Sequence, residues 1–258
     1  LFENEIQVEG HPWYINQDYN NHRDATYEEI LHLVHDYGIG IDGHNSFPGA
    51  MPEYQSEIRE AQKNALSNNL WGIGADSWIN ELIDENSLTQ EYLAALIDSY
   101  YGLWGAWTDS NTHGMWGIYV AKTRDGILKE DSIGAEIMNN KFFHPNLTYN
   151  ARIDSSFNGN FTLRFDSSKP YTNHSQYLKD ITLIGSNDIS VSINQLDNSI
   201  NGNEGINTVI FSGNSSEYIL NISDNKASVI DKISDRDGIN ILQNIEKLQF
   251  KDQTIELN

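Results

Sequence analysis

Two carboxylates and two histidines lie close together in the segment Glu28-Glu29-Ile30-Leu31-His32-Leu33-Val34-His35. On a helix, which turns by about 100° per residue, Glu28, His32 and His35 share a narrow stripe opposite the apolar side chains. Helical side chains four residues apart can reach one ion, and imidazole and carboxylate are both zinc ligands. The segment therefore predicts either a metal site or the solvated polar face of an ordinary amphipathic helix.

A second segment with paired carboxylates covers residues 87–102. Glu91 and Asp98 are seven residues apart, and Ala94 and Ala95 lie between them. A seven-residue spacing places both carboxylates on one stripe of a helix. Because the alanines between them are small, we expect another helix or a bound ion to approach this stripe closely.

Together, the two segments resemble gluzincin metallopeptidases, particularly the lethal-factor-like group. In that family a Glu-aromatic-x-Ala run, which begins here at Glu91, supplies the third zinc ligand. The resemblance implies that His32 and Glu91 bind the metal. It further implies that Glu28 occupies the first ligand position, with His35 as its competitor. Glu29 becomes the base that activates water.

The sequence departs from the gluzincin pattern at one ligand. Glu28 stands where the family has histidine, so the predicted ligand set is harder and more anionic than the usual one. Zinc or another divalent transition metal is therefore the expected cofactor, and loss of catalysis is an alternative. His22 is a further alternative ligand.

Other polar side chains are candidates for completing such a site. Tyr100 or Tyr101 can donate a hydrogen bond to a developing oxyanion, and we take Tyr100 as a candidate catalytic residue. Three further histidines are equally well explained as packed or solvent-facing residues: His113, His144 and His174.

The C-terminal region contains a nine-residue spacing. Asn198-Ser199-Ile200 and Asn207-Thr208-Val209 are nine residues apart, and the run at 202–210 is similar to the nonapeptide repeat of RTX (repeats-in-toxin) proteins. Such repeats wind a parallel β-roll and bind calcium in their turns. Asn207 stands where the repeat has Asp and offers an oxygen without a charge, so we expect weakened calcium affinity.

The residues that follow extend this resemblance. Residues 208–220 resemble the segment that closes an RTX repeat block, and residues 235–252 resemble its usual ending. The resemblance covers about residues 185–256. It implies export by type I secretion machinery and an extracellular location. An unrelated β-sandwich edge rich in Asn-Gly turns is the alternative.

The composition narrows the range of partners. The chain has 258 residues, with 16 Lys and Arg against 37 Asp and Glu, a net charge of −21. This charge disfavours nucleic acid and anionic membranes as partners. The absence of cysteine excludes disulfides and thiolate metal sites. No apolar run approaches the roughly 20 residues that a membrane span needs, so we expect none.

The predicted elements divide the chain into two regions. All eight histidines and all six tryptophans lie in residues 1–175, whose patterns predict several helices. Residues 176–258 contain short Ile/Val-rich runs broken by turn residues. We therefore predict an α+β fold: a mainly helical metal-site domain, 1–175, followed by a β-rich RTX-type domain, 176–258, built as a β-roll or β-sandwich. Residues 157–165 predict a strand pair between them. The expected helices cover residues 24–37, 53–68, 75–85, 88–104 and 130–143.

These observations lead to a secreted metal-dependent peptidase, or a divergent relative of one, acting on proteins or peptides. Two other classes remain open. One is a non-catalytic extracellular module that binds glycan or protein through a tryptophan-rich surface. The other is a metal-dependent enzyme acting on a glycan, in which paired carboxylates serve as acid and base.

Overall fold

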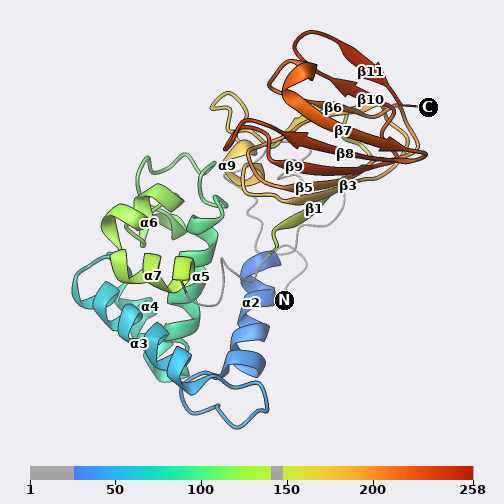
Figure 1. The fold of residues 1–258 in the computed structure, drawn as a ribbon. Helices are drawn as coiled ribbons and strands as arrows, with labels where there is room; N and C mark the ends of the chain where they lie inside the picture. The colour runs from blue at the N-terminus through green and yellow to red at the C-terminus, as the bar shows by residue number, and fades with distance from the viewer. Residues whose placement is uncertain (1–25, 141–147, 258) are drawn as a thin grey trace. The chain divides into compact units, whose positions relative to one another are not determined.

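The computed structural model of the protein describes residues 26–140 and 148–257. These residues form two compact units, a helical one and a β one that begins at Thr148. Helices fill the N-terminal half and mixed β-sheets the C-terminal half, which confirms the predicted α+β class (Figure 1). The β unit begins before the predicted boundary at residue 175, because residues 148–175 contribute two strands and a short helix to it.

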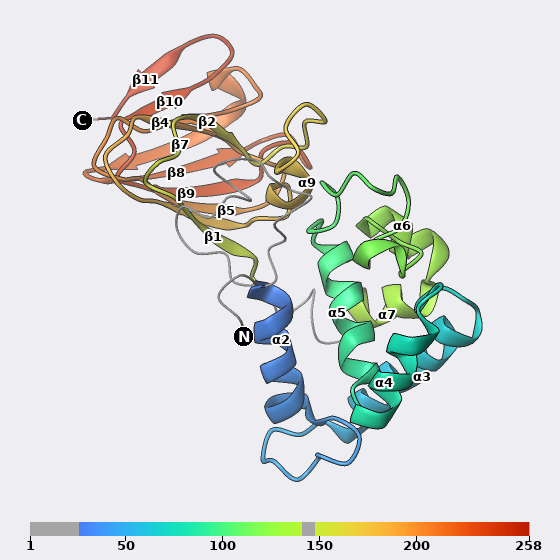
Figure 2. The ribbon, with the colours of Figure 1, turned by 180° about the vertical axis from the view of Figure 1, so that it is seen from behind.

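Helix α5 (Leu88–Tyr100) is the centre of the helical unit. It packs against five other helices, and ten of its 13 residues are buried (Figure 2). A helix that is buried on nearly all sides belongs to a core. The helices around it are α2 (Thr26–Val34), α3 (Pro52–Ser67), α4 (Asp76–Glu85), α6 (Arg124–Glu130) and α7 (Ser132–Asn140).

Local signals set the ends of several of these helices. Pro52 occupies the first turn of α3, where its missing N–H is not needed. Asn86 ends α4 in the left-handed conformation, with φ 59°. The Thr123 hydroxyl accepts a hydrogen bond from the Gly126 amide at the start of α6. These residue choices allow the chain to turn between the helices that surround α5.

Helix α2 continues directly into a π-helix, η2 (His35–Gly40). The sequence predicted one continuous helix as far as residue 37. A π-helix has a wider turn than an α-helix and occurs mostly at functional sites. Here it buries His35 and Ile39, and it ends at Gly40, whose φ of 87° suits glycine. Among the residues of η2, His35, Ile39 and Gly40 are buried, whereas Tyr37 is 59% exposed.

The strands of the β unit alternate between two sheets along the chain. One sheet has the order β1-β3-β5-β9-β8-β7 and the other β2-β4-β6-β10-β11. The strands β1, β3, β5 and β9 pair in parallel, as do β2, β4, β6 and β10. The chain therefore winds as a coil, with one strand in each sheet per turn. The strands are β1 (Asn150–Ile153), β2 (Gly159–Thr162), β3 (Asp180–Leu183), β4 (Ile189–Ser192), β5 (Asn198–Asn201), β6 (Thr208–Ile210), β7 (Tyr218–Ser223), β8 (Lys226–Asp231), β9 (Ile239–Gln243), β10 (Lys247–Gln249) and β11 (Thr254–Glu256).

The coil has a regular spacing in the sequence. The strands β3, β4 and β5 begin nine residues apart, at Asp180, Ile189 and Asn198. Neighbouring turns of the chain touch, because a Cβ atom on Gly202 would lie 1.8 Å from the carbonyl oxygen of Asn244. Only glycine fits there. The core between the sheets consists of inward-facing aliphatic side chains, including Ile181, Val191, Ile200, Val209, Leu242 and Leu248.

The prediction of a strand pair at residues 157–165 was wrong. This segment contains the single strand β2, which pairs in parallel with β4. The preceding strand, β1, lies in the other sheet and pairs with β3. The turn before Gly159 therefore carries the chain from one sheet to the other instead of folding it back on itself.

A buried carboxylate joins the β7–β8 hairpin to the coil. Asp237, just before β9, is fully buried and accepts hydrogen bonds from the Ser212 amide and hydroxyl, both at 2.7 Å. It also accepts one from the Tyr218 hydroxyl at 2.6 Å and pairs with Arg164. Burial, followed by this contact with Asp237, raises the pKa of Tyr218 well above its ordinary value. The first residue of β7 is thus fixed to the segment that precedes β9.

Candidate metal centre

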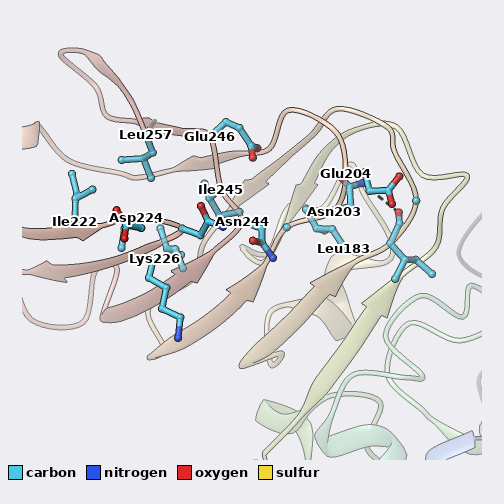
Figure 3. Close-up of a pocket in the computed structure, with 16 residues that line it drawn as sticks. Leu183, Asn203, Glu204, Ile222, Asp224, Lys226, Asn244, Ile245, Glu246 and Leu257 are labelled. Carbon is cyan, nitrogen blue, oxygen red and sulfur yellow. Dashed lines mark hydrogen bonds between the residues drawn. The ribbon is translucent and has the colours of Figure 1, made fainter.

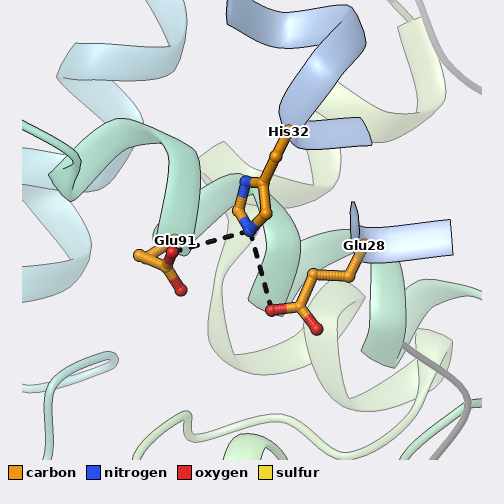
Figure 4. A group of neighbouring side chains, drawn as sticks. All are labelled: Glu28, His32 and Glu91. Atoms are coloured by element: carbon orange, nitrogen blue, oxygen red, sulfur yellow. Dashed lines mark ion pairs between the residues drawn. The ribbon is translucent and has the colours of Figure 1, made fainter. Parts of the chain in front are cut away.

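Three ionisable side chains from two helices point toward one another in the helical unit (Figure 4). Glu28 and His32 lie one turn apart on α2, and Glu91 extends from α5. The His32 Nε2 atom lies 3.8 Å from Glu28 Oε1 and 3.5 Å from Glu91 Oε1. One ligand atom from each residue lies within 4.8 Å of the others. We call these three residues the ligand group.

The two distances from His32 are close to those between ligands of a shared ion. Atoms bound about 2.0–2.2 Å from a tetrahedral zinc ion lie about 3.3–3.6 Å from one another. Hydrogen bonds from a ring nitrogen to a carboxylate are shorter, about 2.7–3.2 Å. The separations of 3.5 and 3.8 Å are therefore closer to the spacing of metal ligands than to that of hydrogen-bonded pairs.

Both carboxylates of the ligand group lie near the N-terminal end of a helix. Glu28 is in the first turn of α2 and Glu91 in the first turn of α5, where its amide donates to the Ser87 carbonyl. The helix dipole favours negative charge at this end. Because α2 packs against α5, the four-residue spacing of Glu28 and His32 is sufficient to direct both side chains toward Glu91.

The charge of the ligand group is strongly negative around its one imidazole. Burial by itself lowers the pKa of His32, but the carboxylates of Glu28, Glu91 and Glu29 outweigh it, so that the pKa is raised above 6.5. Glu28 is only 6% exposed. Buried carboxylates of like charge destabilise one another unless a cation compensates them. A divalent cation fits this donor set in both charge and ligand type.

Helix α2 buries Leu31 and a polar residue, Glu28, while it leaves other apolar residues exposed. Its polar residues Glu28 and His32 face α5, whereas its apolar residues Ile30 and Leu33 are 51% and 61% exposed. Burying polar groups in place of apolar ones raises the free energy unless those groups find partners. Hydrophobic burial alone therefore does not explain why α2 lies this way round. The sequence predicts these polar residues on the side opposite the apolar cluster, and the structure buries Glu28 as well as Leu31 of that cluster.

Glu29, the predicted base, is half-buried beside the ligand group on α2. It directly follows Glu28 and is close enough to His32 to help raise the pKa of that histidine. A carboxylate next to a metal ligand is well placed to accept a proton from water at the ion.

Tyr100, the predicted oxyanion donor, is bound elsewhere. Its hydroxyl donates to the Asn139 side chain on α7, and the Arg124 guanidinium lies 3.9 Å from the centre of its ring. Burial raises the pKa of Tyr100. Tyr100 follows Glu91 by nine residues on α5, which corresponds to about 13 Å along the helix axis. The structure does not bring it into the ligand group.

His35, the predicted competitor ligand, also lies outside the ligand group. Its Nε2 atom is 2.6 Å from Gln55 Oε1, and the Gln55 amide donates to the Thr89 hydroxyl at 3.1 Å. Burial lowers the pKa of His35. Sequence reasoning did not single out Gln55 or Thr89. The available signal is that Gln55 shares the buried face of α3 with Ile58.

The other histidines are separate from this site. The His113 Nδ1 atom lies 2.8 Å from the Thr112 hydroxyl on the surface. His174 is buried in the β unit, where its Nδ1 atom lies 2.9 Å from the Tyr149 hydroxyl. His22 and His144 lie outside the described residues.

A cavity of about 650 Å³ lies in the β unit (Figure 3). Its walls come from the turns that follow β3, β5 and β9 and from the β7–β8 hairpin. Acidic side chains on Glu204, Asp224 and Glu246 and the ammonium of Lys226 line it. The size is in the range of small-ligand sites. None of the predicted site residues lines it, so the candidate chemistry lies in the helical unit.

Comparisons with known proteins do not assign the chain to a family. No protein-family model matches the chain, and no curated protein or solved structure matches it. No described helix is both long enough and apolar enough to cross a membrane. Function therefore has to be inferred from the geometry of the ligand group.

Proposed function

We propose that the helical unit is a metal-dependent peptidase. Glu28, His32 and Glu91 hold one divalent transition metal, zinc being the first choice, and the substrate is the peptide bond of a protein or peptide. The ligand group supports this proposal because it combines one imidazole with two carboxylates at ligand spacing. The order of its residues along the chain also follows the gluzincin resemblance, with two ligands on one helix and the third on a later helix.

The main observation behind the proposal is that α2 buries Glu28 while it exposes Ile30 and Leu33. An ordinary amphipathic helix would bury Ile30 and Leu33 and expose Glu28, whereas α2 does the opposite. Selection for a bound cation explains this arrangement, since the ion offsets the free energy of burying the carboxylates.

In the proposed reaction, a metal supplies Lewis acidity that polarises the scissile carbonyl and lowers the pKa of water. The chain supplies the remaining steps. Glu29 accepts the proton of the attacking water on its carboxylate and passes it to the leaving amine. Glu28, His32 and Glu91 hold their positions on two packed helices throughout.

Metal analysis combined with one substitution tests the proposal. Protein prepared without chelator should contain about one equivalent of transition metal per chain, measured by inductively coupled plasma mass spectrometry. Glu29→Gln should reduce hydrolysis of a denatured protein substrate by at least about 100-fold while retaining the metal. Glu81→Gln, which changes an exposed carboxylate on α4, is the matched control and should keep full activity. Absence of metal, or equal activity of Glu29→Gln and wild type, would refute the peptidase.

The tryptophan-based alternative has less support. Trp71 and Trp104 are 1% and 2% exposed and belong to the core of the helical unit. Trp116 is the exposed one, at 58%. Trp104 contacts both Trp107 and Trp116 edge-on, and of these three rings only Trp116 is more than half exposed, whereas a glycan-binding platform needs a larger open aromatic surface.

For the β unit we propose an RTX-type roll that binds calcium and directs export by type I secretion machinery to the extracellular space. The nine-residue spacing of β3, β4 and β5 and their alternation between two sheets support it. The Oδ1 atom of Asn207 is buried and accepts no hydrogen bond from the described residues, so it remains available to a cation. Calcium prefers such carbonyl and carboxylate oxygens.

Calcium titration tests this second proposal. Thermal unfolding followed by circular dichroism should show a higher midpoint in millimolar calcium than in chelator. Asn207→Asp adds a charged oxygen at the same position and should enlarge the shift. A midpoint that is unchanged by calcium in both proteins would rule out a calcium site in the β unit.

A further inference from the structure

A buried chain of hydrogen bonds crosses three elements next to the ligand group. The His35 Nε2 atom lies 2.6 Å from Gln55 Oε1, and Gln55 Nε2 donates to Thr89 Oγ1 at 3.1 Å. His35, Gln55 and Thr89 are exposed by 0%, 2% and 5%. Buried hydrogen bonds are shielded from water and hold their partners in a defined geometry.

The two ends of this chain lie close in sequence to different metal ligands. His35 follows His32 by three residues, and Thr89 precedes Glu91 by two. Gln55 lies on α3, which packs against both η2 and α5. The two hydrogen bonds therefore connect the element after α2 to the first turn of α5 through a third helix. We therefore expect these two hydrogen bonds to influence the distance between Glu91 and His32.

The chemistry of Gln55 suits this place. Its carbonyl oxygen accepts and its amide nitrogen donates, so it bonds two different partners in fixed directions. Because Gln55 Oε1 only accepts, the His35 Nε2 atom carries the proton and donates it. Glutamate has the same shape, but it would bury a further carboxylate in the helical unit and could not donate to Thr89. An uncharged amide links the elements without changing the charge of the ligand group.

We propose that Gln55 is a positioning residue, which holds η2 and α5 together through His35 and Thr89 so that Glu28, His32 and Glu91 can share one metal ion. This inference rests on the proposed metal site. It assigns a role to His35 that does not require it to be a ligand.

Zinc affinity of full-length variants tests the role of Gln55. Gln55→Met keeps the length of the side chain and removes both hydrogen bonds. We expect it to weaken zinc binding by about 10- to 100-fold, as loss of outer contacts does at other metal sites. Competition with a chelating dye measures the affinity, and the visible spectrum of the Co²⁺-substituted protein reports the ligand geometry. The spectrum should change as well.

Two control pairs separate positioning from general destabilisation. Gln62→Met makes the same change at a buried glutamine two turns further along α3, and it should leave zinc affinity unchanged. Thr89→Ser keeps the hydroxyl and should bind zinc like wild type, whereas Thr89→Val removes it and should behave like Gln55→Met. Should Gln55→Met fail to fold, the Thr89 pair decides the question.

The possible results point to different conclusions. Wild-type affinity and an unchanged cobalt spectrum in both Gln55→Met and Thr89→Val would refute the positioning role and leave the metal site standing. An equal loss of affinity in Gln62→Met would also refute it. A wild-type protein that binds no zinc and no cobalt would refute the metal site itself, and the positioning role with it.

Discussion

Two carboxylate sites, Asp237 in the β unit and the ligand group in the helical unit, surround their acids with different partners. Asp237 in the β unit accepts hydrogen bonds at 2.6–2.7 Å from Ser212 and Tyr218 and pairs with Arg164. In the helical unit, Glu28 and Glu91 face His32 at 3.8 and 3.5 Å.

This difference separates two roles for a buried acid. Donors at hydrogen-bond distance compensate Asp237 within the protein, as expected for a group that stabilises a fold. In the ligand group, two negative groups share one imidazole at a spacing suited to an ion. Stability should therefore depend strongly on Asp237 under all conditions, and on the ligand group chiefly when metal is present.

The largest effect is expected at Asp237. Asp237→Asn turns one of its two accepting oxygens into an amide donor that faces the donors of Ser212 and Tyr218, and it should lower the free energy of unfolding by about 3 kcal/mol or more, with or without metal. Urea unfolding measures it. Asp224→Asn, in the exposed turn between β7 and β8, is the control and should change stability by about 0.5 kcal/mol or less. A similar, small effect of both substitutions would remove the distinction between the two units.

A smaller and metal-dependent effect is expected at the ligand group. Zinc at 100 times its dissociation constant should stabilise the wild-type protein by about 2.7 kcal/mol. Glu28→Gln removes a charged ligand and should abolish most of that gain. Thermal unfolding with zinc and with chelator, in both proteins, measures the difference. Equal stabilisation of wild type and Glu28→Gln would mean that the ion binds elsewhere.

The smallest effect is expected at a partly exposed carboxylate of the helical unit. The hydrogen bonds from Arg59 lower the pKa of Asp42 below its ordinary value of 3.8. The stabilisation is therefore complete above the ordinary pKa and is lost as the pH falls through the lowered one. Asp42→Asn should lower stability by about 0.5–1 kcal/mol at pH 7 and by less near pH 3. Urea unfolding at both pH values measures this; an equal loss at both would contradict the ion pair.

Local patterns predict much of what the structure contains. The four-residue spacing of Glu28 and His32 gives two side chains on one face of α2. The nine-residue spacing between residues 198–200 and 207–209 coincides with β5 and β6, which lie in different sheets. These features depend on residues near one another in the sequence, and the geometry of helix and strand is enough to derive them.

Other features depend on contacts between distant residues. Helical periodicity shows that Glu28 and His32 share a face, but packing against α5 determines that this face is the buried one. The hydrogen bonds of Gln55 could not be predicted from the sequence for the same reason, because its partners His35 and Thr89 lie 20 and 34 residues away along the chain. Likewise, the pairing of β5 with β9 spans the whole β7–β8 hairpin.

The antiparallel strands at one side of the β unit have a consequence for how such a protein can evolve. Beyond β9 and β10, the first sheet continues with β8 and β7 and the second with β11, all running antiparallel to their neighbours. A duplicated turn of the coil cannot be added there without displacing these strands. Among the described strands, β1 and β2 are edge strands, and each pairs on one side only, with β3 and β4 respectively. At the β1 and β2 side, an added turn would displace none of the described strands.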